Sequence, residues 1–186
     1  GRDIAFDVVI VGAGLVGVSF ALILKKKEPD LSILVIESTK LISSDKIAVS
    51  DSDIRGIALS SDSKKIMQTA GLWTTLEKSA APIESIHVSD KGHPGIARLN
   101  RSPNDNDPLG YVVESRYLRG TLRKNLSQSD IQIWYSTEII DASIEKDRVR
   151  LFTSNTEKDI TAKLLVISDG AYSKTASKLG FCIKSK

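Results

Sequence analysis

The apolar positions at the start of the chain fall into short runs with alternating strand and helix patterns. Residues 7–11 form a β-branched run, which is typical of a strand buried on both faces of a parallel sheet. Residues 15–27 predict a helix that is apolar at Val16, Phe20 and Leu22 and ends in lysines, as a helix C-terminus prefers. Residues 32–36 predict a second strand. The pattern therefore indicates a strand-helix-strand unit.

The middle of the chain predicts helices and a hairpin. A helix is expected to start at a cap, Ser61, and to stop at Gly71, with an apolar stripe of Ile66, Met67, Ala70 and Leu72. Trp73 and Leu76 are expected to continue in a second short helix. Residues 83–89 alternate as a half-buried strand does, and residues 96–99 predict a strand that returns beside it.

The second half of the chain adds a further helix and three strands. A helix over 117–127 has leucines on one face. The later strand-like stretches are residues 131–135, 149–153 and 164–167. We therefore expect an α/β, Rossmann-like fold whose parallel sheet is built from residues 7–11, 32–36, 131–135 and 164–167.

Three glycines stand between the first strand and the first helix, in the order Gly12, Gly14 and Gly17. In the G-x-G-x-x-G pattern the first glycine allows a tight turn, the second lets a pyrophosphate approach the backbone, and the third lets the helix pack closely. The free N–H groups and the positive dipole end of the helix attract phosphate without a lysine. This unit predicts an ADP-containing cofactor.

Glu37 ends the second strand, 20 positions after Gly17. A carboxylate at this point can accept hydrogen bonds from both hydroxyls of an adenosine ribose and repels a 2′-phosphate. The adenosine is therefore expected to be unphosphorylated at this hydroxyl, as it is in FAD and NAD.

Asp169 follows the last predicted strand and precedes Gly170, at the sheet edge where open α/β folds bind ligands. The residues alone leave two interpretations open: a ligand-binding carboxylate, or a cap for the helix that follows Ser173.

Composition excludes several classes of protein. The chain has 186 residues, of which 41% are hydrophobic and 26% charged, with a formal net charge of +3. Its lysines and arginines are scattered, so we expect no nucleic-acid partner. A lone cysteine, Cys182, has no disulfide or metal-ligand partner, so we expect no metal site and a reducing, cytoplasmic location. The mild basic excess leaves peripheral attachment to an anionic inner-membrane face open. His87 and His93 are interpreted as surface or turn residues.

Several motifs occur in the order seen in single-component flavoprotein aromatic hydroxylases, which the chain resembles over nearly its whole length. Beside the glycine unit and Glu37 these are Asp53-x-Arg55, Val112 to Arg116, and Asp169-Gly170-x-x-Ser173. Residues 86–95, which include Ser-Asp-Lys-Gly-His, resemble the ubiquinone-biosynthesis branch, and within it the 2-octaprenyl-6-methoxyphenol hydroxylases.

The resemblance implies FAD as cofactor, NAD(P)H as reductant and a prenylated phenol as substrate, with membership of a ubiquinone-biosynthesis complex left open. It implies that FAD contacts Gly12, Gly14, Gly17, Glu37, Arg55, Arg116, Ile139 and Asp169. It also implies that residues 1–186 are an incomplete FAD-binding domain, in which residues 83–113 begin a substrate-side β segment.

The chain departs from the family pattern in three respects. Ile54 replaces a common glycine beside Arg55. Ala176 replaces an arginine of the Asp-Gly motif, and this second departure weakens the pyridine-nucleotide assignment more than the FAD assignment. The third is a missing Gly-Asp-Ala-rich flavin motif, so we expect a fragment without activity of its own. Another flavin oxidoreductase on this scaffold, or a non-catalytic assembly fragment, are the alternatives. No catalytic acid, base or nucleophile is assigned.

Overall fold

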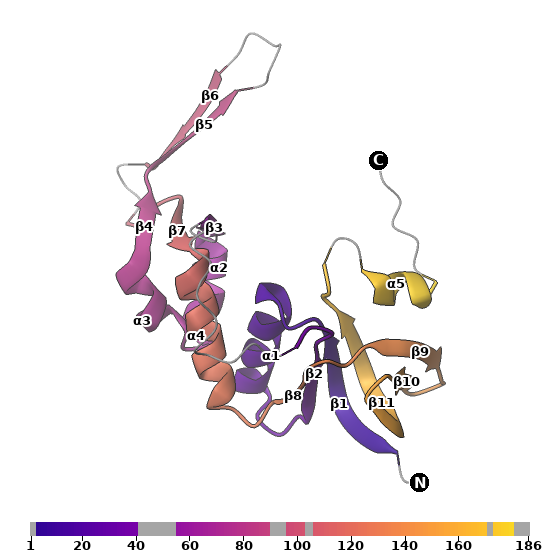
Figure 1. Cartoon of the computed structure of the whole chain (residues 1–186). Helices are drawn as coiled ribbons and strands as arrows, with labels where there is room; N and C mark the ends of the chain where they lie inside the picture. The colour runs from indigo at the N-terminus through magenta and orange to yellow at the C-terminus, as the bar shows by residue number, and fades with distance from the viewer. Residues whose placement is uncertain (1–2, 41–54, 90–95, 103–105, 171–172, 181–186) are drawn as a thin grey trace. The chain divides into compact units, whose positions relative to one another are not determined.

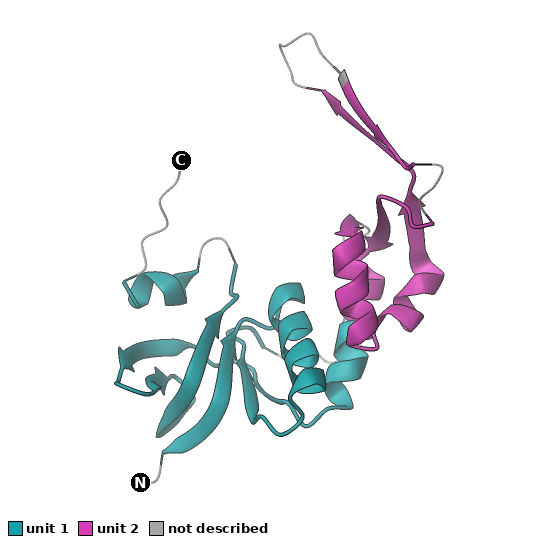
Figure 2. Cartoon of the chain, turned by 180° about the vertical axis from the view of Figure 1, so that it is seen from behind, with its two compact units in different colours: residues 1–47, 122–186 teal, residues 48–121 magenta. Residues whose placement is uncertain are grey.

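The computed structural model describes residues 3–40, 55–89, 96–102, 106–170 and 173–180. The chain divides into two compact units, shown in separate colours in Figure 2. Unit 1 comprises residues 1–47 and 122–186, and unit 2 comprises residues 48–121.

Unit 1 is built on a six-stranded sheet with the strand order β8-β2-β1-β11-β10-β9. Its parallel part contains β1 (Ile4–Val11), β2 (Ile33–Ile36), β8 (Gln132–Trp134) and β11 (Thr156–Ile167). The register pairs Val9 with Leu34 on one side and with Leu165 on the other. The predicted α/β fold is confirmed, and each of the four predicted segments contributes a strand to the parallel part.

The core of the sheet is apolar because β2 and the C-terminal half of β1 are buried. Every residue of β2 is buried, and Val9 and Ile10 of β1 are completely inaccessible to solvent. The helix α1 (Leu15–Lys27) packs against β1 and β2, as Figure 1 shows. Its bounds agree with the prediction.

The face of α1 that meets the sheet consists of Gly17, Val18, Ala21 and Leu22. Val16 and Phe20, which the apolar pattern included, are 71% and 37% exposed. Gly17 and Ala21 allow close packing of the helix on the sheet, and Val16 and Phe20 lie on more exposed faces.

An antiparallel meander completes the sheet of unit 1. It consists of β9 (Ile139–Ile144) and β10 (Val149–Thr153), which pair with each other and then with β11. Sequence reasoning missed β9, and it placed the start of β11 eight residues too late, at 164 instead of 156. A short helix, α5 (Lys174–Lys178), follows β11 and contacts β9.

Unit 2 contains a three-stranded antiparallel sheet in the order β3-β7-β4. The strands are β3 (Gly56–Ser60), β4 (Ala80–Ile83) and β7 (Gly110–Glu114). The helices α2 (Ser61–Thr69) and α3 (Trp73–Leu76), with the 3₁₀ turn η2 (Glu77–Ser79), connect β3 to β4. The helix α4 (Ser115–Ser127) begins in unit 2 and continues into unit 1.

Two predictions for α2 require correction. The cap is Ser60, whose hydroxyl accepts a hydrogen bond from the Ser63 N–H over 3.1 Å, and not Ser61. Within the predicted apolar stripe, Met67 and Leu72 are buried as expected, but Ile66 is 49% exposed. In contrast, the leucines Leu118 and Leu122 of α4 are buried as the pattern predicted.

The hairpin of β5 (Ser85–Ser89) and β6 (Ile96–Asn100) forms a separate two-stranded sheet. Its antiparallel pairing agrees with the predicted returning strand. Every residue of β5 is exposed, so the expectation of a half-buried strand was wrong. Alternation signals one apolar face, but burial of that face depends on a neighbouring element. His93 and Ile54 lie outside the described residues.

Among the described residues, no helix combines the length and the apolar character needed to cross a membrane.

Candidate functional site

The tight turn after β1 is held against the end of β11. Gly12 has a φ of +102°, a conformation that L side chains rarely adopt. A Cβ atom on Gly12 would lie 2.6 Å from the carbonyl oxygen of Ser168 and 2.9 Å from the Cα of Asp169. Only glycine fits here, because both the backbone conformation and the close approach of another strand exclude a side chain.

Ser168 fastens this turn from the opposite side. Its backbone N–H and its hydroxyl each donate to the carbonyl oxygen of Val11 over 2.8 Å, and the hydroxyl lies 3.3 Å from the Gly12 carbonyl oxygen. A Cβ atom on Gly17 would overlap the Gly12 carbonyl and approach the Ser168 hydroxyl to 2.6 Å. Gly17 therefore serves close packing of α1 on the turn, the role predicted for a third glycine.

Gly14 differs from the other two glycines. It is the N-cap of α1 in ordinary extended backbone, with a φ of −73°, and no side chain caps the helix. A Cβ atom on Gly14 would meet nothing within 4 Å. Neither conformation nor protein packing requires glycine here, so its missing side chain leaves space beside a helix N-terminus, where N–H groups and the helix dipole favour an anion.

The carboxylate of Glu37 lies against this turn. Its Oε2 accepts the Ala13 N–H over 2.8 Å, and its Oε1 accepts the N–H and the hydroxyl of Thr39, each over 2.9 Å. Burial raises the pKa of Glu37, but the hydrogen bonds from the Thr39 and Ala13 amides outweigh it and leave the pKa below its ordinary value. Glu37 is therefore a carboxylate at neutral pH.

The carboxylate retains acceptor capacity for a ligand. A carboxylate has about four lone-pair positions, and Oε2 accepts only the Ala13 amide among the described residues. The hydroxyls of Ser38 and Thr39 near Oε1 can turn away and let another hydroxyl take their place, since side-chain rotamers interconvert readily. The arrangement suits a sugar with two adjacent hydroxyls.

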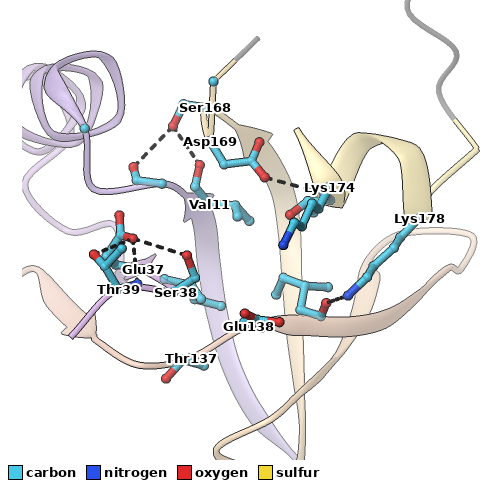
Figure 3. A pocket seen from close by; sticks show the side chains of 16 residues that line it. Val11, Glu37, Ser38, Thr39, Thr137, Glu138, Ser168, Asp169, Lys174 and Lys178 are labelled. Carbon is cyan, nitrogen blue, oxygen red and sulfur yellow. Dashed lines mark hydrogen bonds between the residues drawn. The ribbon is translucent and has the colours of Figure 1, made fainter. Parts of the chain in front are cut away.

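An open pocket of about 490 Å³ joins these elements within unit 1. This volume lies in the range of small-molecule sites. Figure 3 shows its side chains, which come from the ends of β1, β2 and β11, the segment before β9, and α5. The lining includes Gly12, Gly14, Glu37, Ile139 and Asp169, which are five of the eight residues predicted to contact a cofactor.

The structure combines the two interpretations of Asp169. The cap of α5 is Ser173, whose hydroxyl accepts the Ala176 N–H over 2.8 Å. Asp169 also approaches the helix, since its Oδ2 lies 3.4 Å from the Thr175 N–H, and it lines the pocket. Because Ser173 already caps the helix, Asp169 is not required as the cap.

The side chain of Ile139 lies in the core, and the residue also lines the pocket. The side chain is 4% exposed and packs with Leu151 and Ile160. Its carbonyl oxygen accepts the Lys178 ammonium over 2.9 Å, which ties α5 to β9.

Arg55 and Arg116 belong to unit 2, so their contact with the pocket remains a prediction. The Arg55 carbonyl oxygen accepts the Ser115 N–H over 2.9 Å. The Arg116 guanidinium forms an ion pair with Glu114 over 2.6 Å and lies 4.9 Å from the ring centre of Tyr117. Within unit 2 the backbones of these two predicted segments are therefore joined.

Sequence reasoning missed several residues of the site. Ser168 donates a hydrogen bond to the Val11 carbonyl oxygen at the turn, and Thr39 donates to the Glu37 carboxylate. Lys178 donates to the Ile139 carbonyl oxygen in the pocket wall. The only local signal was proximity, because Thr39 follows Glu37 by two positions and Ser168 directly precedes Asp169.

Comparisons with known proteins find relatives of this chain among ubiquinone hydroxylases. A ubiquinone hydroxylase, UbiL, of Rhodospirillum rubrum is 28% identical over 184 residues, which are 98% of this chain and 41% of the relative. A ubiquinone hydroxylase, UbiM, of Neisseria meningitidis is 28% identical over 181 residues, which are 94% of this chain and 38% of the relative.

Among solved structures, p-nitrophenol 4-monooxygenase PnpA of Pseudomonas putida has the same fold. Its TM-score is 0.72 at 20% identity, covering 95% of this chain and 44% of that one. The chain spans about two fifths of the length of the curated relatives that it matches. The model of the FAD binding domain family matches residues 5–186. The chain therefore belongs to the FAD binding domain family.

Proposed function

We propose that this chain is the adenosine-binding part of a FAD- and NAD(P)H-dependent monooxygenase that hydroxylates a prenylated phenol in ubiquinone biosynthesis. Three observations support the proposal. The chain belongs to the FAD binding domain family, two relatives are named ubiquinone hydroxylases, and the pocket has the chemistry that an adenosine diphosphate requires.

The residues present fit FAD. The backbone at Gly14 leaves space for a pyrophosphate beside the first amides of α1, and Glu37 offers its carboxylate to the ribose hydroxyls. When bound, FAD supplies the redox chemistry that passes an oxygen atom from O₂ to an electron-rich ring, with NAD(P)H as the source of electrons. The protein binds and orients the cofactor, and Ser168 keeps the turn rigid for this purpose.

The observation that carries the proposal is the contact between Ala13 and Glu37. It places a carboxylate 2.8 Å from the turn that leads to Gly14, so one ligand can reach both the helix N-terminus and the acid. A helical turn with a structural role alone has no need of an open Gly14 position and an acid beside it.

Titration of the purified chain with FAD, ADP and 2′-phospho-ADP tests cofactor binding. We expect FAD and ADP to bind and 2′-phospho-ADP to bind at least about tenfold more weakly, because Glu37 repels the extra phosphate. Absence of binding by FAD and ADP at tens of micromolar would identify the chain as a scaffold fragment and reject the cofactor assignment.

Activity requires a separate test on a protein that includes the remaining portion found in the relatives. We expect consumption of NAD(P)H and O₂ to depend on a prenylated phenol, with a hydroxylated product identified by mass spectrometry. Electron transfer from NAD(P)H without incorporation of oxygen would instead indicate another flavin oxidoreductase on the same scaffold.

We also propose that the whole protein works at a membrane surface, because a prenyl tail partitions into lipid. We further propose that it works there within an assembly of ubiquinone-biosynthesis proteins. Co-sedimentation with anionic vesicles tests the membrane contact, and it should weaken as salt screens the basic excess. Sedimentation that is equal in the absence and presence of vesicles would argue against it.

A further inference from the structure

Two side chains of opposite charge line the part of the pocket that lies beyond Glu37. Glu138 stands directly before β9, and Lys174 is the first residue of α5. Figure 3 shows both reaching into the pocket. Within the part of the chain that the structure describes, neither side chain has a hydrogen bond or an ion pair.

The backbone on both sides is fixed. The Thr137 N–H donates to the Glu37 carbonyl oxygen over 3.0 Å, and the Glu138 N–H donates to the Ser154 hydroxyl over 2.9 Å. On α5, the Lys178 ammonium holds the Ile139 carbonyl, and Lys174 lies one helical turn earlier on the same face. The backbones that carry Glu138 and Lys174 are therefore held by hydrogen bonds, and the carboxylate and the ammonium can bind a ligand.

The proposed positions of phosphate and ribose indicate which part of a bound nucleotide lies between Glu138 and Lys174. If phosphate binds at Gly14 and ribose at Glu37, the base attached to that ribose must occupy the remaining lining, which includes Thr137, Glu138 and Lys174. Adenine presents an exocyclic amine, which donates, beside a ring nitrogen, which accepts. A carboxylate and an ammonium are the complementary pair.

We propose that Glu138 and Lys174 read the edge of the adenine: Glu138 accepts from the exocyclic amine, and Lys174 donates to the neighbouring ring nitrogen. The inference rests on the proposed function and extends it from cofactor class to base specificity. Hypoxanthine, which carries a carbonyl oxygen in place of the amine, would place that oxygen against the Glu138 carboxylate and be rejected.

Calorimetric titration of the chain with ADP and inosine diphosphate tests the role of Glu138. We expect the wild type to prefer ADP by about tenfold, since one well-placed polar contact to a base discriminates by this order. In Glu138→Gln the side-chain amide can donate to the hypoxanthine oxygen as well as accept from the amine, so the preference should fall to about twofold or less. Glu157→Gln, an exposed position outside the pocket, removes the same charge and should retain the preference.

Lys174→Met separates base reading from phosphate attraction. We expect affinity for ADP and for adenosine to fall by the same factor, about three- to tenfold, because the base is common to both ligands. Lys158→Met, another exposed position outside the pocket, should change neither affinity.

The outcomes distinguish this inference from the function on which it rests. Binding of ADP and inosine diphosphate with equal affinity, or a loss in Lys174→Met confined to ADP, would overturn base reading while leaving the cofactor assignment intact. Failure of the wild type to bind ADP would overturn both.

Discussion

The N–H of Ala13 donates to Oε2 of Glu37 over 2.8 Å, so the turn after β1 and the residue that follows β2 are joined directly. The two residues are 24 positions apart in the chain. Because the parallel pairing of β1 with β2 brings both strand ends to one edge, the carboxylate lies beside the open start of α1. Substitutions at these residues should therefore change nucleotide affinity and stability in predictable directions.

Glu37→Ala should weaken binding of FAD and ADP by about 1–3 kcal/mol, because it removes the acceptor for the ribose hydroxyls. Titration monitored by flavin absorbance or calorimetry gives the two affinities. The free energy of unfolding should also fall, since the Ala13 and Thr39 amides lose their acceptor. Unchanged nucleotide affinity in a folded variant would contradict the placement of ribose at Glu37.

Gly14→Ala should keep the fold and reduce affinity for FAD and ADP about tenfold or more. The new methyl group meets no protein atom within 4 Å, and the backbone is already in a conformation that alanine adopts. It would occupy space that the pyrophosphate needs. Thermal unfolding and ligand titration on the same sample check both parts, and a variant that binds ADP like the wild type would refute the phosphate position.

Gly17→Ala should mainly reduce the free energy of unfolding, whereas Gly14→Ala should mainly reduce nucleotide affinity. Its methyl group would overlap the Gly12 carbonyl and crowd the Ser168 hydroxyl, so α1 has to move away from the turn. Overpacking of this kind costs about 1–3 kcal/mol. Urea unfolding measures the change, and a midpoint equal to that of the wild type would show that α1 does not pack on the turn as described.

Acid should destabilise the chain through Glu37 and Asp7. Burial raises the pKa of Glu37, but hydrogen bonds donated by the amides of Thr39 and Ala13 outweigh this effect and keep the pKa below 4.5. The Lys163 ammonium, with the Ser32 N–H and hydroxyl, keeps the pKa of Asp7 below 3.8. The folded state therefore holds protons less tightly than the unfolded state, and the stabilisation is complete above these ordinary values.

Stability should accordingly fall as the pH drops below about 4.5 and each carboxylate is protonated, first Glu37 and at lower pH Asp7. Urea midpoints measured between about pH 6 and pH 3 give the slope. Glu37→Gln should flatten the upper part of this dependence, and Asp7→Asn the lower part. A slope that is identical in all three proteins would show that other groups control acid unfolding.

Arg116→Met should weaken binding of FAD but leave binding of ADP unchanged. The pocket of unit 1 contains the residues proposed for the adenosine half, and Arg116 belongs to unit 2. Arg123→Met, an exposed position on α4, is the matched control. If Arg116 serves only its ion pair with Glu114, neither affinity will change, and its predicted contact with the cofactor is wrong.

Local pattern was enough to predict the elements that carry the site. The β-branched runs before Gly12 and Glu37, and the lysines that end α1, indicated two strands and one helix whose observed bounds are close to the predicted ones. These features depend on contacts between residues a few positions apart, so they are encoded in short stretches of sequence. The spacing of Gly12, Gly14 and Gly17 likewise specified the turn.

Residue-level burial and the meander required the tertiary structure. Val16 and Ile66 belong to apolar stripes yet are exposed, because exposure depends on which neighbour covers each face of a helix. Five of the six residues of β9 are exposed or half-buried, so its pattern gave little signal, and only pairing with β10 makes it a strand.

The sequence by itself determined that this chain has a strand-turn-helix unit with an acid after the second strand, because local periodicity and glycine chemistry suffice for that. Only the tertiary structure decided that Ser168, 157 positions from Val11, fastens the turn, and that Lys178 holds the Ile139 carbonyl. Such contacts depend on the strand order of the sheet, since β11 lies beside β1 through long-range pairing that no short segment encodes.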